Sequence, residues 1–444
     1  MKSDWRQVTL DEVSVKLGDG LHGTPNYEND GEYYFINGNN LNDGKISYSE
    51  KTRRASKVEY EKYKKDLNKN TVFVSINGTL GNTSFYNNEK VILGKSVCYI
   101  NLKDDVNKYF IRYVLKNNHF QDYLDVYSTG TTIKNMPLKA MREYKFYLPE
   151  LKIQNKVAHV LSTLDDKIEL NNKINQTLES IAQAMFKSWF VDFDPVHAKA
   201  NAKSVDEYDA IAKELGISRE ILDLFPSEFE ESELGLIPKG WGYEYISKVS
   251  NVGIGKTPPR KEKQWFIDKM GIKWVSIKDM GINSTFIMST SEQLSREAID
   301  KFNIKLVPAF SVLLSFKLTV GRVSVTTEDM CTNEAIAHFN LLQHDGINTE
   351  YLYLYLKTFD YGSLGSTSSI ASAINSKIVK TIPVLIPQNN IINRFDALIA
   401  PLFKNILFVS RQIDYLEKIR DLLLPKLLSG EIDVSNLNLE PEND

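Results

Sequence analysis

The chain has 444 residues, of which 42% are hydrophobic and 25% charged, and its formal net charge is −3. This composition is ordinary for a soluble protein and supplies enough apolar residues for two or three cores. The sequence contains neither an apolar run of membrane-spanning length nor an initial signal peptide, so we expect a cytoplasmic protein with no membrane partner. The two cysteines, Cys98 and Cys331, predict neither a metal knuckle nor a disulfide framework. The small negative charge does not exclude nucleic-acid binding, because the local field matters more than the sum.

A first globular domain is predicted over residues 1–150, where short β-like runs alternate with turn residues. Two of its loops, 18–24 and 128–134, are rich in glycine or small polar residues and could approach a ligand closely. Basic residues outnumber acidic ones between residues 51 and 69. The part from residue 57 onward fits a solvated helix face as well as a surface that contacts a DNA backbone.

A long helix is predicted over residues 151–195, because apolar or small residues recur there alternately four and three positions apart. This rhythm is typical of a coiled-coil seam, and roughly 40 helical residues would span about 60 Å. Two ordinary amphipathic helices packed on local cores are the alternative reading of this helix and its later counterpart. The seam predicted here comprises Val157, Leu161, Leu164, Ile168, Asn171, Leu178 and Met185.

The rhythm also passes through Asn175, which leaves the chemistry of the middle of the seam open. Asn171 and Asn175 could lie in the seam and hold the register of the two helices, since buried polar residues select one alignment. Alternatively, Ile174 supplies the contact and the asparagines face solvent.

A helical and acidic connector is predicted over residues 196–235, followed by a second globular domain over residues 236–388. A second long helix with the same rhythm is predicted over residues 389–430. Pro401 and Pro425 lie inside it, and each should kink or break it because proline lacks a backbone donor. The predicted seam of this helix comprises Phe395, Ile399, Leu402, Ile406, Val409, Ile413 and Leu416.

A tail follows over residues 431–444, and its polar, acidic part from Asn436 to Asp444 is expected to be loose.

The two globular segments repeat one another. Ser75 in Val-Ser-Ile-Asn-Gly-Thr-Leu-Gly corresponds to Ser315 in Leu-Ser-Phe-Lys-Leu-Thr-Val-Gly, an offset of 240 residues, and Pro149 corresponds to Pro387, an offset of 238. One long helix follows each segment. The pattern indicates a duplicated unit of globule and helix, that is, a pseudo-dimer on one chain whose surface residues differ between the copies.

Catalytic motifs are missing from the sequence. Gly255-Lys256-Thr257 resembles the end of a phosphate-binding loop, but Ser250 stands where that motif needs a glycine, and Pro258 disfavours the helix that must start there. The chain has neither the Asn/Asp-Pro-Pro-aromatic tetrapeptide of amino-methyltransferases nor a dinucleotide-binding glycine loop, and its six histidines have no metal-ligand spacing. We therefore expect a binding protein that is not an enzyme and holds no cofactor or metal.

Several loops carry basic, amide and hydroxyl side chains of the kind that read base edges and grip phosphates. For any single residue, a simple turn is the alternative, but recurrence of the loops in both halves favours a role for the set. The candidate DNA-binding residues of the first half are His22, Thr24, Asn37, Asn39, Arg53, Arg54, Ser75, Asn77, Thr79, Lys95, Thr129, Thr131 and Lys134. Those of the second half are Lys256, Thr257, Ser276, Lys278, Ser315, Lys317, Thr319, Arg322, Ser366, Ser368 and Ser369.

Four stretches, taken together, resemble the specificity subunit of Type I restriction–modification systems. They are Leu161-Ser-Thr-Leu-Asp-Asp-Lys-Ile-Glu-Leu-Asn171, Phe186-Lys-Ser-Trp-Phe-Val-Asp-Phe-Asp-Pro195, Glu233-Leu-Gly-Leu-Ile-Pro-Lys-Gly-Trp241 and Leu423-Leu-Pro-Lys-Leu-Leu-Ser-Gly430. The resemblance covers nearly the whole chain. It implies a mixed α/β (α+β) protein in which an antiparallel coiled coil of two long helices, with an internal pseudo-twofold repeat, separates two target-recognition domains.

The resemblance also implies a function and partners. Each recognition domain would read one half of a split, asymmetric site in double-stranded DNA. The partners would be two adenine methyltransferase subunits and two motor-nuclease subunits, to which S-adenosylmethionine and ATP would belong. Antiparallel helices would separate the domains by about 50–60 Å, somewhat over one turn of DNA at roughly 35 Å, and so could set the spacer between half-sites.

A bivalent DNA-binding regulator without a methyltransferase, or a coiled-coil scaffold that binds proteins, is the alternative function. Co-purification with a methyltransferase would distinguish the first, and the absence of salt-dependent DNA binding would favour the second.

Overall fold

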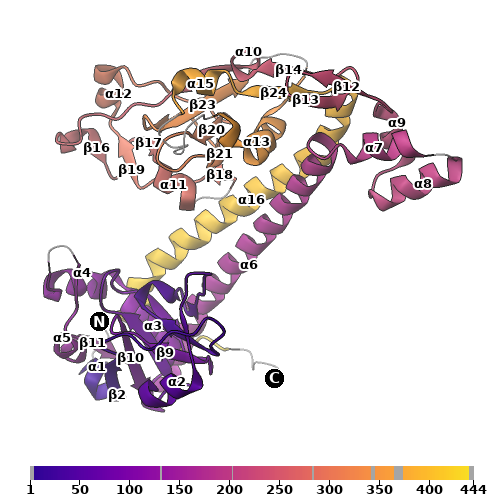
Figure 1. Ribbon diagram of the computed structural model, residues 1–444. Coiled ribbons are helices and arrows are strands. Elements are labelled where there is room, and N and C mark those ends of the chain that lie inside the picture. Colours follow the sequence, from indigo (N-terminus) through magenta and orange to yellow (C-terminus); the bar gives the residue numbers. More distant parts are fainter. Residues whose placement is uncertain are drawn as a thin grey trace. The chain divides into compact units, whose positions relative to one another are not determined.

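The computed structural model describes most of the chain. The described ranges are residues 5–130, 133–202, 204–282, 285–341, 346–364 and 374–439. The chain forms two compact units: unit 1 contains residues 1–168 and 416–444, and unit 2 contains residues 169–415. Helices and strands are mixed in both units (Figure 1), which confirms the predicted fold class.

Unit 1 is built on an antiparallel sheet of four strands. Their order is β2 (Ser14–Asp19), β10 (Val97–Leu102), β7 (Thr71–Ser75) and β8 (Thr83–Phe85). Every residue of β7 and β10 is buried, as expected for central strands covered on both faces. A smaller sheet contains β6 (Arg54–Ala55), β3 (Tyr33–Ile36) and β9 (Val91–Leu93), and β3 runs parallel to β9.

Short elements complete the recognition part of unit 1. The strand pairs are β1 (Arg6–Thr9) with β11 (Lys145–Leu148), and β4 (Leu41–Asn42) with β5 (Lys45–Ile46). The helices are α1 (Leu10–Val13), η1 (Gly38–Asn40), α2 (Lys57–Tyr63), α3 (Lys108–Lys116), α4 (Asn118–Tyr127) and α5 (Leu138–Glu143). Helix α3 buries Phe110, Tyr113 and Val114 in the main core of the unit.

Unit 2 repeats this architecture. Its main sheet has the order β15 (Ser250–Ile254), β23 (Ile336–Leu341), β20 (Val312–Ser315), β21 (Val323–Thr326) and β18 (Phe286–Ile287). Its second sheet has the order β16 (Phe266–Ile267), β19 (Glu292–Leu294), β17 (Ile272–Val275) and β22 (Cys331–Thr332), with β17 parallel to β22. The first four strands of the main sheet correspond in order and direction to β2, β10, β7 and β8, so the structure bears out the internal repeat.

The helices of this recognition part are short. They are α10 (Ile246–Val249), η2 (Lys263–Trp265), α11 (Ile277–Ile282), α12 (Arg296–Phe302), α13 (Thr349–Thr358), η3 (Tyr361–Leu364) and α15 (Ser376–Lys380). The pair β14 (Gly242–Tyr245) and β24 (Pro383–Ile386) joins the two ends of the segment, as β1 and β11 do in unit 1.

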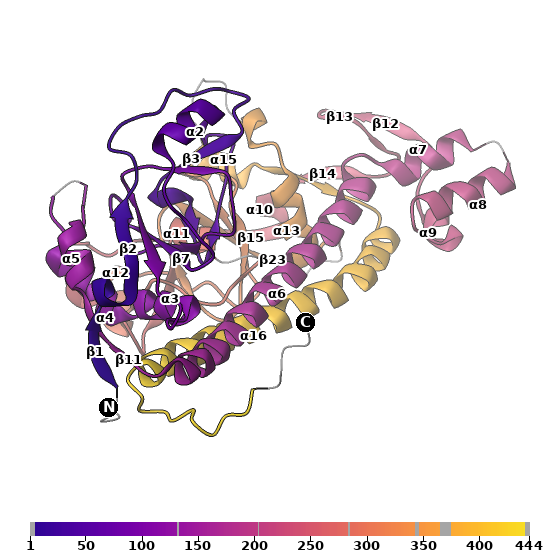
Figure 2. The same cartoon turned by 90° about the horizontal axis from the view of Figure 1, so that it is seen from below.

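The connector is more ordered than the sequence indicated. It contains α7 (Asp194–Asn201), α8 (Val205–Glu214), α9 (Arg219–Leu224) and a hairpin of β12 (Phe229–Ser232) with β13 (Gly235–Pro238) (Figure 2). The acidic end of the predicted connector therefore forms strand β12. Aromatic residues anchor this part, since Trp189 at the end of the first long helix packs edge-on against Phe225, with ring centroids 5.1 Å apart.

The two long helices are α6 (Leu151–Phe190) and α16 (Asn389–Leu428), and they pack antiparallel. In unit 2, the amides of Asn171 and Asn175 donate hydrogen bonds to Gln412 and Ser410, at 3.4 and 3.0 Å. Asn171 is 1% exposed and Asn175 3%, whereas Ile174 is 37% exposed. The structure thus decides between the two alternatives: the asparagines lie in the seam.

The seam of α16 departs from the predicted stripe in its middle. Phe403 and Ser410 are buried there, while the neighbouring Leu402 and Val409 are only half-buried. Such a shift by one residue is expected because a straight helix of 3.6 residues per turn drifts relative to a seven-residue repeat. The other predicted seam positions of both helices are buried or half-buried.

Helix α16 runs without a break through Pro401 and Pro425, so the break expected at these prolines does not occur. Both prolines are exposed, and so are Ala397 and Asp421, whose carbonyl groups lose their helical donors. Water can therefore satisfy the freed carbonyls. In the part of the chain that the structure describes, no helix is both long and apolar enough to cross a membrane.

Candidate nucleic-acid interface

Three predicted DNA-binding residues of unit 1 line one hollow. His22, Asn77 and Lys95 surround a space of about 490 Å³ at one end of the main sheet. The other residues that line it are Asp19, Ile76, Asn135, Met136, Pro137 and Leu138. A concave surface with a few converging polar groups is the usual form of a recognition site.

Glycine brings the walls of this hollow together. A Cβ atom at Gly20 would lie 2.3 Å from the carbonyl oxygens of Leu93 and Gly94, so only glycine lets the loop after β2 approach the turn that carries Lys95. Unit 2 repeats the device at Gly255, where a Cβ atom would lie 2.2 Å from the carbonyl oxygens of Thr332 and Asn333. The loop over residues 18–24 and the equivalent loop around Gly255 are therefore points of close approach in the two units.

The opposite wall of the hollow is held by hydrogen bonds to one asparagine. The Asn77 amide donates to Asn135 Oδ1 at 3.0 Å, and the backbone groups of Asn135 pair with those of Thr129 at 2.8 Å. Lys134 is exposed and forms an ion pair with Asp125 at 2.5 Å. Asn135 thus connects Thr129 to the loop that carries Asn77.

Two arginines of unit 1 stack on aromatic rings at the surface. The Arg53 guanidinium lies 5.7 Å from the centroid of the Tyr27 ring, and that of Arg54 lies 4.7 Å from the centroid of the Tyr34 ring. Arg54 also donates a hydrogen bond to the Tyr34 hydroxyl at 2.8 Å. Both arginines are exposed, so their cationic groups are held in place yet accessible to an anion.

A capping triad fixes the loop after β3. Asn40 Oδ1 accepts a hydrogen bond from the Asn37 backbone N–H at 2.9 Å, and the Asn40 amide donates to Thr52 at 3.3 Å. Asn37 is half-buried, and its side-chain oxygen accepts from the Ser96 hydroxyl at 2.9 Å. Asn39 is exposed beside it.

The equivalent triad of unit 2, each member 239 residues later, is Ser276, Asp279 and Ser291. Asp279 is 2% exposed and accepts four hydrogen bonds, from the backbone N–H and hydroxyl groups of both serines, at 2.6–2.8 Å. Burial raises the pKa of the Asp279 carboxyl, but the hydrogen bonds from Ser276 and Ser291 outweigh burial and hold this pKa below its usual value. The triad orients α11, which carries Lys278.

Replacing Asp279 with asparagine is expected to destabilise unit 2 by about 1–3 kcal/mol at pH 7, because the amide nitrogen cannot accept the serine hydrogen bonds. The lowered pKa adds a pH dependence. The contribution of a carboxylate of this kind is present above its unfolded pKa and is lost as the pH falls through its folded pKa. Urea unfolding of wild type and D279N should therefore differ most near neutral pH and converge in acid; a constant difference would contradict this.

Three further candidates of unit 2 form hydrogen bonds within that unit. Lys256 is exposed and donates to the Phe302 carbonyl at 2.6 Å, and Thr257 is half-buried and hydrogen-bonds to Glu334. Arg322 is half-buried and donates to the Ile277 carbonyl at the start of α11, at 2.6 Å. Four further candidates in the two units are exposed: Thr24, Thr79, Lys317 and Thr319.

Ser75 and Ser315 have a different role from the one predicted. Both are fully buried, and each hydroxyl closes a loop: Ser75 accepts from the Asn82 N–H at 2.8 Å, and Ser315 accepts from the Arg322 N–H at 3.0 Å. Neither hydroxyl is accessible to DNA, so we withdraw both from the candidate contacts and interpret them as loop-positioning residues.

Some residues cannot be placed, and others were missed. Thr131, Ser366, Ser368 and Ser369 lie outside the described residues. Sequence reasoning missed Asn135 and Asp279. The first follows directly on a loop that had been singled out. The second occupies the position of Asn40 in the repeat, and because Asn40 was not a candidate either, aligning the halves does not single out Asp279.

The comparisons with known proteins agree with this geometry. A family model of the Type I restriction modification DNA specificity domain matches residues 2–180 and, a second time, residues 238–407. The chain belongs to this family. It is the DNA sequence-recognition subunit of a restriction–modification system, and the two matches fall on the two halves of the internal repeat.

Relatives and a solved structure match over most of this specificity subunit. It is 32% identical to the HindI specificity subunit of Haemophilus influenzae, over 73% of this chain and 77% of that protein. It is 29% identical to the MjaIX specificity subunit of Methanocaldococcus jannaschii, over 76% and 71%. The crystal structure of an S subunit from M. genitalium shares the fold, with a TM-score of 0.53 and 16% identity over 95% of this chain and 96% of that one.

Proposed function

We propose that this specificity subunit reads a bipartite site in double-stranded DNA, with residues 1–150 contacting one half-site and residues 236–388 the other. The observation that carries the proposal is one scaffold with different side chains at equivalent positions. Asn77 corresponds to Lys317, and Lys95 corresponds to Glu334. An amide, a cation and an anion select different base edges, so the halves should recognise different sequences.

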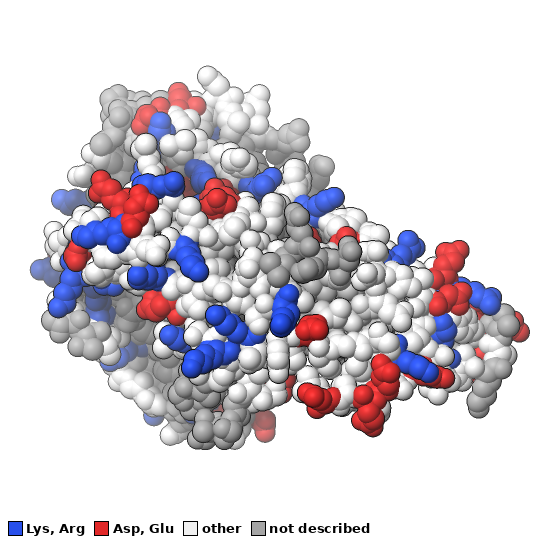
Figure 3. All heavy atoms as spheres, turned by 90° about the horizontal axis from the view of Figure 1, so that it is seen from above, with Lys and Arg blue, Asp and Glu red and all other residues white. Residues whose placement is uncertain are grey.

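Basic and acidic side chains are interspersed on the face of the molecule that Figure 3 shows. Affinity for DNA would therefore come from individual cations at particular positions. We assign Arg53 and Arg54 to phosphate contacts, since their aromatic supports leave the guanidinium groups exposed. The residues around the hollow, Asn77 and Lys95 among them, would read bases.

The long helices would set the spacer and bind the catalytic partners. In unit 2, apolar side chains of both helices are exposed, including Leu170, Ile181, Phe408 and Tyr415. Exposed apolar groups on packed helices favour a protein partner. We propose two adenine methyltransferase subunits here and two motor-nuclease subunits in the full complex.

Catalysis in the cytoplasm, with S-adenosylmethionine and ATP, would belong to those partner subunits. A methyltransferase assay on the chain alone tests this assignment, because robust activity without the partner would refute it. Family membership disfavours the alternatives of a stand-alone regulator or a protein scaffold.

The proposal is tested by mapping methylated adenines in DNA from cells that produce this chain with its methyltransferase partner. We expect one methylated sequence made of two short half-sites separated by a spacer of fixed length. A single continuous site would contradict reading by two domains, and unmethylated DNA from cells that contain both proteins would contradict the partnership.

A further inference from the structure

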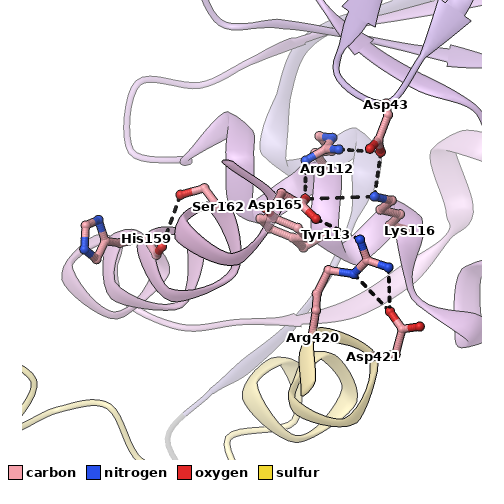
Figure 4. Close-up of polar contacts among 9 residues, drawn as sticks. All are labelled: Asp43, Arg112, Tyr113, Lys116, His159, Ser162, Asp165, Arg420 and Asp421. Carbon is pink, nitrogen blue, oxygen red and sulfur yellow. Dashed lines mark hydrogen bonds and ion pairs between the residues drawn. The ribbon is translucent and has the colours of Figure 1, made fainter. Parts of the chain in front are cut away.

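A half-buried carboxylate of α6 forms the centre of a polar network in unit 1 (Figure 4). The side chain of Asp165 is 13% exposed. Its Oδ2 atom accepts hydrogen bonds from Arg112 at 3.1 Å and from the Tyr113 hydroxyl at 2.9 Å, and its Oδ1 atom accepts from Arg420 of α16 at 2.9 Å. Burial raises the pKa of Asp165, but the charge of Lys116 and the hydrogen bonds from Arg420 and Tyr113 outweigh burial and lower this pKa.

The network extends to the loop that carries candidate DNA-binding residues. Arg112 and Lys116 also form ion pairs with Asp43, at 2.6 and 2.5 Å. Asp43 lies in the turn between β4 and β5, directly after the capped segment that holds Asn37 and Asn39. The α6 carboxylate therefore connects the helix pair, through two cations of α3, with a loop that carries candidate DNA-binding residues. Such a loop is called a reading loop below.

A second carboxylate of α6 has the same role in unit 2. The side chain of Glu179 is 15% exposed and accepts from the Tyr353 hydroxyl at 2.6 Å, from Lys357 at 3.3 Å and from the Thr285 hydroxyl at 3.1 Å. Tyr353 of α13 corresponds to Tyr113 of α3, 240 residues earlier, and Lys357 repeats the position of Lys116 within one residue. Thr285 closely follows α11, which carries Lys278.

We propose that Asp165 and Glu179 are positioning residues for target recognition, each acting on one half-site. Each carboxylate contacts a tyrosine and a lysine of its domain and fixes the position of the chain segment next to a reading loop. Fourteen residues separate them, about four helical turns, so one helix carries both attachments. The inference rests on the proposed function, in which each domain reads one half-site.

The reason for a selective effect is the cost of an unpaired buried charge. Without Asp165, the Arg112 side chain, which is 6% exposed, would keep only Asp43 as a counter-ion, and the turn with Asp43 would shift to accommodate it. The contacts of Glu179 involve residues of unit 2 alone. Each substitution should therefore change the geometry of one set of reading loops.

The test measures methylation of a DNA library, randomised one base pair at a time in both half-sites, by the chain assembled with its methyltransferase partner. D165N should reduce discrimination against single mismatches about tenfold, which lies within the penalty that one mismatch normally carries. The reduction should be confined to the half-site read by residues 1–150. E179Q should do the same only in the other half-site. D166N, which removes an exposed carboxylate of the same helix, should leave both unchanged.

Tyr113→Phe and Tyr353→Phe keep the test decisive should D165N or E179Q not fold, because each removes one hydroxyl and leaves the charges paired. Each should relax the same half-site as its carboxylate variant, to a smaller extent. Equal relaxation of both half-sites, or full discrimination in all four variants, would overturn the inference. Exchange of residues 236–388 in the same assay tests the proposed function separately, since it should change one half-site whether or not the carboxylates position the loops.

Discussion

Replacing residues 236–388 with the corresponding segment of another family member is expected to change one half-site completely and leave the other half-site and the spacer unaltered. The structure favours this exchange because β14 and β24 pair near the two ends of the segment, so the incoming domain brings both strands of that pair. Its reading loops belong to unit 2, and the loops around Asn77 and Lys95 belong to unit 1. Methylation mapping before and after the exchange measures the result.

The incoming segment should be chosen with a tyrosine and a lysine at the positions of Tyr353 and Lys357, so that Glu179 keeps its partners. An exchange of the chain's own segment for one with conservative changes in β14 and β24 alone provides the control, and both half-sites should persist. A change in both half-sites after the full exchange would show that the domains do not read independently.

Lengthening both long helices by one heptad is expected to lengthen the spacer between the half-sites by about three base pairs. Seven residues preserve the seam register, and they add about 10 Å of helix at 1.5 Å per residue, against about 3.4 Å per base pair. The insertions belong between Ile168 and Glu169 and between Tyr415 and Leu416. These positions separate the Asp165–Arg420 hydrogen bond from the Asn171–Gln412 hydrogen bond in the sequence of both helices.

Insertion into α6 alone is the matched control. It would move Asn175 out of register with Ser410 on one side of the insertion or Asp165 out of register with Arg420 on the other, and should weaken the complex instead of giving a new spacer. Methylation mapping of both variants gives the outcome. An unchanged spacer in the double insertion, with methylation retained, would refute the idea that the helices set the spacing.

The repeat and the long helices could be predicted because both are properties of sequence spacing. Val157, Leu161 and Ile168 fall on one stripe, and that stripe is buried. The position of the seam in the middle of α16 could not be predicted. Whether Leu402 or Phe403 is buried depends on how far the helix drifts relative to its partner. The break expected at Pro401 and Pro425 does not occur, because the effect of a proline depends on whether water reaches the freed carbonyl groups. Predicting this requires knowledge of which face of the helix is exposed.

The candidate site was predictable as loops but not as individual contacts. Glycine at positions 20 and 255 marks a close approach, but only the structure shows the carbonyl groups that require it. The sequence motif marked Ser75 and Ser315 as candidate contacts, but both hydroxyls are buried and close loops. A hydroxyl that closes a loop and one that binds a ligand look the same in a sequence. The attachments of Asp165 and Glu179 join residues up to 255 positions apart, beyond the reach of local patterns.

The charge difference between Lys95 and Glu334 has a consequence for the direction in which DNA is held. A palindrome would allow a symmetric reader to dock in two equivalent ways. Equivalent positions of the two halves carry a cation, Lys95, and an anion, Glu334. With the base contacts proposed for these positions, turning the duplex end for end would bring each side chain to the wrong bases. A difference of about 1.4 kcal/mol would already favour one direction tenfold, so an asymmetric target would give a direction to binding by a chain that is built from two similar halves.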